Sequence, residues 1–408
     1  VSTQSTGTPM LHLQIPESDN CEKLLKMKQQ YQDITNFAEF TYLATPWAKT
    51  NQLSERVQNF VDEWRTSIPE QQLTTREKTV YFTLIGAVFN QLQSYSELST
   101  HFLTQAVRFD QQNFFAYLQL GIASTKALNY RRAELMFSLA RRFAPAECLS
   151  DLLSQFSQLY RLMPDQSLLA KSLQLSREAV EMNPNSDQAW FSLGLSLLKL
   201  QKCENDLAKS GQALRKAIQI RELQQKPFPD CRFNYGMLLK MRLEFQQAYE
   251  QFRKAGEEDC SLQQALQQAT MLEDVAQQAA NKCHGRQLEL GVFGDPQKGF
   301  LGLAVGANKF VVSFRILAKL SENQIPMFYL VQSLDKQHNV RAVFCLQDGV
   351  KELEVGAIVQ LQEVGVKVVS LKTKANKYEF VALVGAGQMQ VNGSEVGRGV
   401  VEWKSELQ

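Results

Sequence analysis

The sequence lacks the motifs that mark most enzymes. Its 408 residues include only 4 histidines, which stand in unrelated contexts at His12, His101, His284 and His338. No segment matches HExxH, GxSxG, a P-loop, or a GxGxxG between a strand and a helix. Neighbouring carboxylates such as those of EEDC at 257–260 are typical of solvated helix faces. We therefore expect no catalytic residues, no metal site and no cofactor.

An excess of one charge and long apolar runs are also missing. A formal net charge of +2 creates no global field that would attract nucleic acid or an anionic membrane. The longest apolar runs, such as ELMFSLA at 134–140, fall far short of the roughly 20 residues that span a bilayer. These absences predict a soluble protein with no membrane partner.

Cysteine pairing is not visible either. The 7 cysteines are scattered, odd in number and never arranged as CxxC. This usage is typical of a reducing compartment and argues against structural zinc, so we expect a cytoplasmic protein. The sequence has no signal-peptide pattern, and it begins with Val1 rather than Met, which is compatible with a fragment of a longer protein.

The composition of the chain changes once, near residue 285. Before this point the chain is rich in Leu, Gln, Ala, Lys and Glu, with few glycines. After it, Gly, Val and Phe recur at alternating positions. The change predicts a helical region followed by a region of strands.

A repeat of about 34 residues organises the helical region. Residues at positions 4, 7, 8, 20, 24, 27 and 32 match the signature of the tetratricopeptide repeat (TPR). They are Tyr117, Leu120, Gly121, Ala133, Phe137, Ala140 and Pro145. Position 8 recurs at Gly86, Tyr160, Gly194 and Gly236. Small residues at 8 and 20 let two helices approach closely, and aromatic residues at 4 and 24 fill the space between hairpins. We expect Trp190, at position 4 of its unit, to be a core residue rather than one that stacks on a ligand.

Six segments after Leu301 predict β-strands. They are short, rich in β-branched and aromatic residues, and separated by turn-forming residues. They read KFVVSFRIL, IPMFYLVQSL, VRAVFCLQ, GAIVQLQEV, VKVVSLKTK and YEFVALVGA. Strands of this length within about 100 residues suggest a small antiparallel barrel, and an OB-like barrel is the best candidate.

These patterns predict an α+β multidomain protein: an all-α TPR solenoid followed by an antiparallel OB-like β-barrel. We expect a capping helix over residues 261–280 at the end of the solenoid. The expected parts are a disordered segment 1–19, N-terminal helices or degenerate repeats 20–80, the TPR solenoid with its capping helix 81–280, a linker 281–300 and the barrel 301–400.

The concave face of the solenoid is the candidate binding surface. Positions 2, 5, 6, 9, 12 and 13 of each first helix face a ligand there. Positions 5 and 9 hold Leu118 and Ile122, or Ser157 and Arg161, so the Lys and Asn of a terminal-carboxylate clamp are absent. Arg161 and Asp230 instead suit a peptide that carries both charges, because Arg binds carboxylates bidentately and Asp accepts from a guanidinium. The alternative for each is a solvated helix face or an internal ion pair.

Segments from both halves of the chain resemble one family. PDCRFNYGMLLK at 229–240, AYEQFRKA at 248–255, SREAVEMNPNSDQAWFSLGLSLL at 176–198 and the strand segments above are similar to the tetratricopeptide repeat protein 5 family, also called Strap. The similarity runs from about residue 20 to residue 400. It implies a TPR solenoid joined to an OB barrel. It also implies a ribosome-associated adaptor that recognises the N-terminal Met-Arg-Glu peptide of nascent α- and β-tubulin. Through a deadenylase-recruiting adaptor, such a protein directs decay of tubulin messenger RNA.

The resemblance also implies a set of peptide-binding residues. Asp230 coincides with the family's peptide-binding aspartate, with Asn234 beside it. Arg161 coincides with the groove arginine, for which Gln155 is the alternative alignment, and Arg108 stands where the family has a lysine. The tubulin arginine would then pair with Asp230 and the tubulin glutamate with Arg161. The basic segment that contacts the ribosome in the family is reduced here to Lys282, His284 and Arg286.

Two other functions stay open. OB barrels often bind single-stranded nucleic acid through exposed aromatic residues and a basic groove. The candidates are Phe310, Phe314, Phe328, Tyr329, Phe344, Tyr378 and Phe380, with Lys372, Lys374 and Lys377. The resemblance also implies a stress-response scaffold for acetyltransferase coactivators, which would add a nuclear location to the cytoplasmic one.

Overall fold

The fold is that of a computed structural model. It describes residues 13–18, 20–41, 46–200, 204–282, 306–308, 312–321, 327–334, 341–346, 353–362, 364–373, 376–385, 389–392 and 394–395. Most of the predicted N-terminal disordered segment and most of the predicted linker lie outside these residues.

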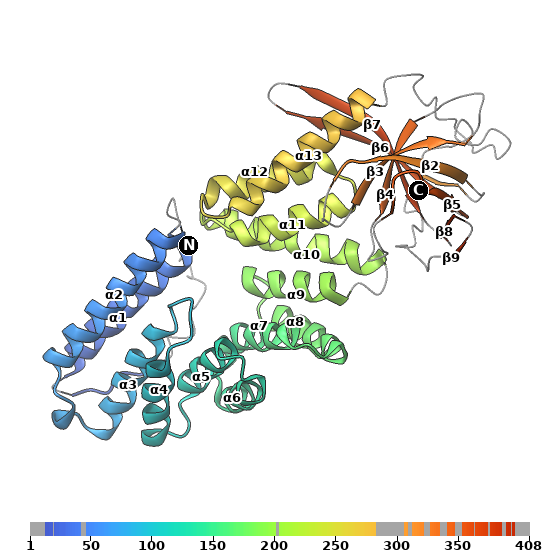
Figure 1. Cartoon of the computed structure of the whole chain (residues 1–408). Helices are drawn as coiled ribbons and strands as arrows, with labels where there is room; N and C mark the ends of the chain where they lie inside the picture. The colour runs from blue at the N-terminus through green and yellow to red at the C-terminus, as the bar shows by residue number, and fades with distance from the viewer. Residues whose placement is uncertain are drawn as a thin grey trace. The chain divides into compact units, whose positions relative to one another are not determined.

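The described part of residues 13–282 contains thirteen α-helices, which Figure 1 labels in chain order. They are α1 Cys21–Phe40, α2 Pro46–Ser67, α3 Thr75–Phe89, α4 Glu97–Phe109, α5 Phe114–Lys126, α6 Tyr130–Phe143, α7 Ala146–Leu162, α8 Leu169–Met182, α9 Asp187–Leu200, α10 Glu204–Leu223, α11 Pro229–Met241, α12 Phe245–Glu258 and α13 Gln263–Lys282. The N-terminal region is therefore all-helical, as the repeat pattern predicts.

The helices pack as TPR-like hairpins because glycine stands where two helices approach closely. A Cβ atom at Gly121 of α5 would lie 2.5 Å from Cε1 of Phe137 in α6. A Cβ atom at Gly236 of α11 would lie 2.7 Å from Cε1 of Phe252 in α12. In both hairpins a position-8 glycine receives the position-24 phenylalanine, so the signature residues make the contacts that the repeat requires.

Short polar side chains begin several of these helices. Thr74 and Glu77 form a capping box at the start of α3. The side chain of Asn113 accepts from the backbone of Ala116 at 3.0 Å, and it caps α5 in this way. These caps separate the repeats along the chain.

Trp190 differs from the sequence expectation. Its ring is half-buried rather than buried in the core, and its indole N–H donates to the carbonyl of Pro184 at 2.8 Å. The spacing of proline and tryptophan in NPNSDQAW therefore ties the preceding turn to the start of α9.

The C-terminal strands form one mixed sheet in the order β1-β6-β7-β4-β3-β2-β5-β8-β9. The strands are β1 Gly306–Asn308, β2 Val312–Lys319, β3 Met327–Ser333, β4 Arg341–Leu346, β5 Ile358–Leu361, β6 Val364–Lys372, β7 Lys377–Gly385, β8 Met389–Val391 and β9 Ser394–Glu395.

This sheet corrects the expectation of a purely antiparallel structure. Strands β4 and β7 pair in parallel, with Val343 opposite Ala382, whereas the other described pairs are antiparallel. The parallel pair arises because β5 and β6 come between β4 and β7 in the chain and bring β7 back in the same direction. The pairing among the described strands is open, so a closed barrel is not confirmed.

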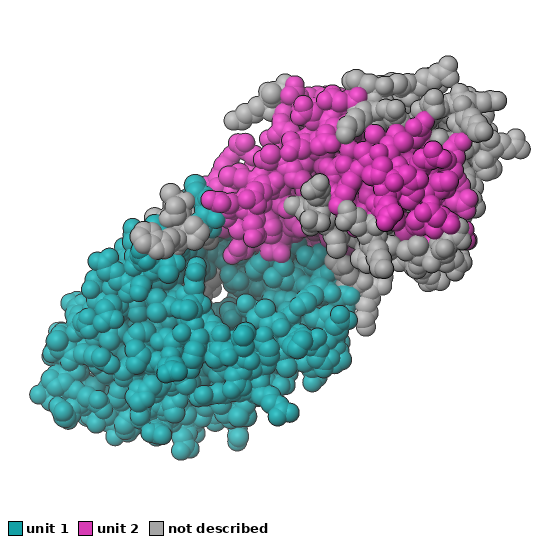
Figure 2. Space-filling view, in the orientation of Figure 1, with its two compact units in different colours: residues 1–200, 212–228, 258–261 teal, residues 201–211, 229–257, 262–408 magenta. Residues whose placement is uncertain are grey.

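The chain divides into two compact units, which Figure 2 colours teal and magenta. Unit 1 comprises residues 1–200, 212–228 and 258–261. Unit 2 comprises residues 201–211, 229–257 and 262–408. Helix α10 thus contributes to both units, while α1 to α9 belong to unit 1 and the sheet belongs to unit 2.

Candidate functional site

Arg161 lies buried between α7 and α9 in unit 1. Its Nη1 atom donates to Ser157 Oγ at 2.9 Å, to Ser192 Oγ at 3.0 Å and to Ser196 Oγ at 3.0 Å. It also reaches the carbonyl of Ser192 at 3.2 Å. Only 9% of the residue is exposed. Burial lowers the pKa of the guanidinium to about 10. One edge of the guanidinium is therefore held in place by three serines.

The other edge of the Arg161 guanidinium carries its Nε and Nη2 atoms. Among the described residues, its Nε and Nη2 atoms have no acceptor, and no carboxylate lies within ion-pair distance. Because a buried cation without a counter-ion is unfavourable, this arrangement favours binding of an external anion. A carboxylate would match the two free N–H directions of the guanidinium.

The serines around Arg161 also bond to one another. Ser172 of α8 lies 2.9 Å from Ser157 Oγ and 2.9 Å from Ser196 Oγ. All three serines are fully buried. Hydroxyl groups can donate or accept, so this network holds the guanidinium in place without neutralising its charge.

A second polar cluster lies in unit 1, around Arg221 of α10. Arg221 pairs through Nε with Asp187 of α9, and through Nη1 with Glu39 of α1 at 3.3 Å. Its guanidinium also lies 4.3 Å from the ring centre of Phe228 and 5.2 Å from that of Phe40. The cluster therefore joins the end of the first helix to the tenth.

Asp151 of α7 faces this cluster. Burial, together with the negative charges of Asp187 and Glu39, raises its pKa to about 7. Sequence reasoning missed Asp151. Ser154 is position 2 of its repeat, and Asp151 lies three residues before it on the same face of α7. Counting the ligand-facing positions one turn further toward the start of α7 would have included Asp151.

Helix α1 lies against the same concave side. The ring of Tyr31 meets that of Phe115, at position 2 of the α5 repeat, edge-on with 6.5 Å between ring centres. The protein's own first helix therefore covers part of the face that the repeats were expected to offer to a ligand.

The other predicted peptide-binding residues lie apart from Arg161 in the fold. Arg108 is exposed on α4, which is the second helix of its hairpin rather than the first. Its Nη1 lies 3.5 Å from Gln105 Oε1. Asp230 is exposed in the first turn of α11 in unit 2. The side-chain amide of Asn234 donates to the backbone carbonyl of Asp230 at 2.8 Å. Arg161 and Asp230 thus belong to different units, and their joint use stays a prediction.

The predicted ribosome-binding residues are not placed by the structure. His284 and Arg286 lie outside the described residues, and of Lys282 only the backbone at the end of α13 is described.

The aromatic residues proposed for nucleic-acid stacking are buried wherever the structure describes them. Their exposed fractions do not exceed 8%. They are Phe314, Phe328, Tyr329, Phe344, Tyr378 and Phe380. Phe310 and Lys374 lie outside the described residues, while Lys372 and Lys377 are exposed. Buried rings cannot stack on bases, so nothing on the described sheet favours the nucleic-acid function.

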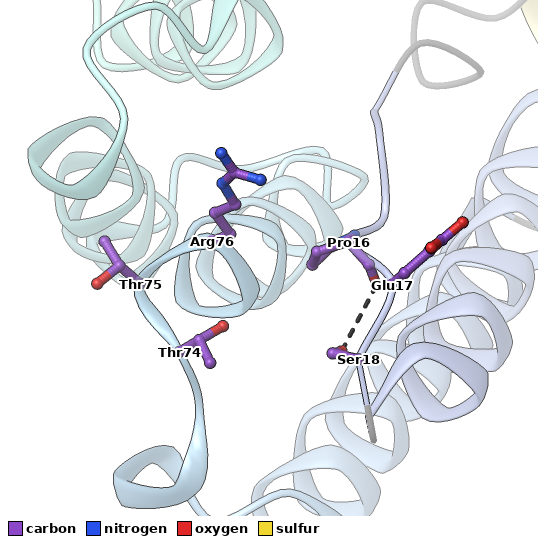
Figure 3. Close-up of a pocket in the computed structure, with 6 residues that line it drawn as sticks. All are labelled: Pro16, Glu17, Ser18, Thr74, Thr75 and Arg76. Atoms are coloured by element: carbon purple, nitrogen blue, oxygen red, sulfur yellow. Dashed lines mark hydrogen bonds between the residues drawn. The ribbon is translucent and has the colours of Figure 1, made fainter.

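A shallow pocket with a volume of about 640 Å³ lies where the N-terminal segment meets α3. Figure 3 shows its lining residues Pro16, Glu17, Ser18, Thr74, Thr75 and Arg76. Beside it, hydrogen bonds from Thr74, Ser18 and Asn20 outweigh burial and lower the pKa of Glu77 to about 2. This carboxylate is committed to capping α3 and to fixing the N-terminal segment.

Among the described helices, none combines the length and the apolar character that a membrane span needs. The described part of the chain also contains no group of three or more His, Cys, Asp or Glu side chains that could hold a metal ion.

Comparisons with known proteins show no family for this chain, and the solved structures similar to it have TM-scores below 0.5. No family model and no curated protein matches the sequence. YrrB, a TPR protein with an unusual peptide-binding site, is 19% identical over 51% of this chain and 97% of its own, with a TM-score of 0.35. PilF of Pseudomonas aeruginosa is 13% identical over 52% of this chain and 95% of its own, with a TM-score of 0.38. A thermophilic TPR protein of Thermus thermophilus is 16% identical over 43% of this chain and 90% of its own, with a TM-score of 0.36. The hairpin packing described above is what defines the repeats of this chain.

Proposed function

We propose that this protein is a non-enzymatic adaptor that binds a short acidic peptide segment through Arg161. The observation that carries the proposal is a buried guanidinium with three serine partners and a free edge, in the absence of a described carboxylate partner. A peptide carboxylate that enters this position would complete the hydrogen bonding of Arg161 and neutralise it. TPR hairpins supply the curved surface on which such a segment can lie.

The proposed ligand is the N-terminal Met-Arg-Glu segment of nascent tubulin. The sequence resemblance supports this identity, and its glutamate supplies the carboxylate that Arg161 lacks. Unit 1 also offers a carboxylate for the tubulin arginine, because Asp151 lies ten residues before Arg161 on α7, a rise of about 15 Å. Asp230 and Asn234 of unit 2 stay predicted contacts for the same arginine, and Arg108 stays a predicted contact as well.

The downstream partners in this proposal follow from the same resemblance. The protein would act at the ribosome in the cytoplasm, with Lys282, His284 and Arg286 as ribosome contacts, and recruit a deadenylase-directing adaptor to tubulin messenger RNA. A nuclear scaffold for acetyltransferase coactivators is the alternative. It predicts a groove that binds a different client.

The same proposal includes the OB-like barrel. In the sheet, β1 is the first strand and pairs with β6. In the chain, β2 follows β1 after three residues. In this proposal the ladder from β2 through β3, β4, β7 and β6 closes on itself. Such a closure would remove both edges of that ladder.

The test is a binding titration with a labelled tubulin N-terminal peptide and a second peptide in which its glutamate is replaced by glutamine. We expect Arg161→Ala to weaken the first peptide by about tenfold or more, since a charge-assisted hydrogen bond contributes about 1.5–3 kcal/mol. The glutamine peptide should bind both proteins equally weakly.

Arg177→Ala is the matched control, because Arg177 is an exposed arginine on the neighbouring helix α8. It should leave both affinities unchanged, and circular dichroism should show that each variant remains folded. Equal binding of the glutamate peptide by wild type and Arg161→Ala would contradict the role of Arg161. Failure of the wild type to bind the peptide at all would contradict the tubulin assignment.

A further inference from the structure

Leu128, in the turn between α5 and α6, combines exposure with a strained backbone. Its φ is +57°, in the left-handed region that favours glycine, and 71% of the residue is exposed. The amide of Leu128 donates to the carbonyl of Thr125 at 3.0 Å, which places the residue in the turn that ends α5. Leucine is less stable than glycine in this conformation, because its Cβ crowds the backbone. The turn therefore needs the backbone of residue 128 but not its side chain.

The same position of a later repeat shows a leucine that the fold does use. Leu243 follows Gly236 by seven residues, just as Leu128 follows Gly121. The φ of Leu243 is +59°, but only 2% of this residue is exposed. Burial of its apolar side chain offsets the backbone strain at Leu243, and Leu128 has no such compensation. Strain without a packing role is typical of a functional surface.

Helix α6 continues the exposed surface that Leu128 begins. Leu135 is 56% exposed, and Arg131, Arg132 and Arg142 are exposed as well. Residues three, four and seven apart lie on one face of a helix, so Leu135 shares a face with all three arginines. Leu128 stands two residues before the helix begins, at one end of this face. We call these five residues the α6 face.

The opposite side of α6 is fixed in the core of unit 1. Ala133, Phe137 and Ala140 are at most 1% exposed. The one acidic residue of α6, Glu134, accepts a hydrogen bond from Oη of Tyr160 in α7 at 2.7 Å. Helix α6 is thus held in place through its inner side, and its only carboxylate is engaged by α7.

The three arginines of the α6 face have no acidic partner in the described part of the chain. No ion pair or hydrogen bond joins any of them to a carboxylate there. The guanidinium of Arg142 lies 5.7 Å from the ring centre of Phe143. The neighbouring Arg141, by contrast, pairs with Glu178 of α8. The positive charge of the α6 face is therefore available to an acidic ligand.

The repeat itself does not require this charge. Helix α12 has the same buried positions as α6, with Ala248, Phe252 and Ala255 fully buried. The four α6 positions of the face correspond in α12 to polar or acidic residues. They are Gln246, Gln247, Glu250 and Glu257. The combination of arginine and leucine is thus a property of the α6 hairpin and not of the fold.

We propose that the α6 face docks an acidic amphipathic helix of a partner protein. The two leucines would contact the apolar side chains of that helix, and the three arginines would pair with its carboxylates. Helix α6 has 14 residues and presents a ridge about 21 Å long, on which a second helix can pack lengthwise. Charge complementarity favours an acidic partner. The leucines favour a protein over nucleic acid, because a phosphate backbone would use the arginines alone.

Selection of binders tests the chemistry of this partner. A display library of single helices of about 20 residues, randomised on one face, would be selected on the full-length protein. We expect the enriched helices to carry net negative charge together with apolar side chains on the randomised face. Their binding should weaken by more than about threefold between 50 and 300 mM salt, because the arginines are exposed. Enrichment of neutral or basic helices, or no enrichment at all, overturns the proposal.

Substitutions locate the binding site of a selected helix. Leu135→Asp, and the double substitution Arg131→Glu with Arg132→Glu, should each weaken binding by about tenfold or more. Leu25→Asp, which changes an exposed leucine of α1, is the matched control and should bind as wild type. Arg161→Ala should also bind as wild type, so this result is independent of the proposed function. An acidic helix that binds folded Leu135→Asp as tightly as wild type overturns the proposal.

Glycine at residue 128 separates binding from stability. Leu128→Gly relieves the backbone strain, so this variant should melt no lower than wild type and yet bind the selected helix more weakly. Leu243→Gly, at the equivalent position, should melt several degrees lower because it empties a buried site. Unchanged affinity of Leu128→Gly would contradict the role of this residue in the face.

Two other occupants of the α6 face would replace the proposed one. Self-association of the protein that Leu135→Asp abolishes would show that the face binds a second copy of this chain. A single-stranded RNA oligonucleotide that binds wild type but not the double arginine variant would show a nucleic-acid ligand. Either result overturns the proposal of an acidic helix.

Discussion

At the residue scale, the position of Arg161 was predictable but its surroundings were not. The repeat register places it at position 9, on the ligand-facing side of α7. Its burial depends on Ser192 and Ser196, which come from the next repeat. Serine has no strong pattern in a helical sequence, because its hydroxyl serves equally well toward water, the backbone or a neighbour. A network of this kind becomes visible only when the helices are packed.

Asp151 leads to a prediction about stability. Its pKa in the folded protein is about 7, above the 3.8 of a free aspartate, so the folded state holds the proton more tightly than the unfolded state. The stability that this group contributes is complete at low pH and is lost as the pH rises toward 7. Asp151→Asn should therefore raise the free energy of unfolding at pH 8 by up to about 4 kcal/mol, with little effect near pH 4.

Thermal unfolding at several pH values measures this effect. Glu147→Gln, which changes an exposed carboxylate one turn earlier on α7, should leave the profile unchanged. A stabilisation by Asp151→Asn that was the same at pH 4 and pH 8 would show that charge is not its cause.

At the scale of elements, helices and their partners were predictable because the TPR signature encodes a local contact. Gly121 and Phe137 are close in sequence and meet across one hairpin. The strands were predictable from the alternation of apolar and polar residues along the chain. Which strands pair with one another in the sheet was not predictable in this way. Val343 of β4 finds Ala382 of β7 only after β5 and β6 have been placed, and alternation says nothing about such distant choices.

Two glycines give a matched test of the hairpin contact. A Cβ atom at Gly121 would lie 2.5 Å from Phe137, so Gly121→Ala should destabilise the protein by about 1–3 kcal/mol through overpacking. At Gly211 of α10 the nearest atom would be 3.4 Å away, in ordinary contact. Gly211→Ala should therefore be neutral or stabilising by up to about 1 kcal/mol, because alanine favours the helix.

Chemical denaturation of both variants compares the two sites under one condition. If Gly121→Ala were as stable as Gly211→Ala, the close approach of α5 and α6 described here would be wrong.

At the scale of the whole molecule, composition and compactness divide the chain at different places. The change in composition near residue 285 follows the end of α13, because it reflects secondary structure. The compact units instead assign residues 229–257 to the unit that contains the sheet. Unit membership depends on tertiary contacts, which a change in residue usage does not report.

The near-zero net charge also has a measurable consequence. With a net charge of +2 the molecule has little long-range attraction for an acidic peptide, and a pair formed at the buried Arg161 is screened only weakly by salt. We expect the dissociation constant of the tubulin peptide to change less than about threefold between 50 and 300 mM salt. A loss of more than tenfold in the same titration would indicate that exposed charges dominate binding.

Helix α10 limits how this protein can be dissected. Its first residues, 204–211, belong to unit 2 and the remainder belongs to unit 1, which also takes residues 258–261 from further along the chain. No single uninterrupted stretch of sequence reproduces unit 1 and nothing else. Deletion mapping that ends near residue 200 would remove Arg221 together with the C-terminal half. Activities lost on such truncation could then be assigned to the wrong half of the protein, and point substitutions are the sounder route to separating them.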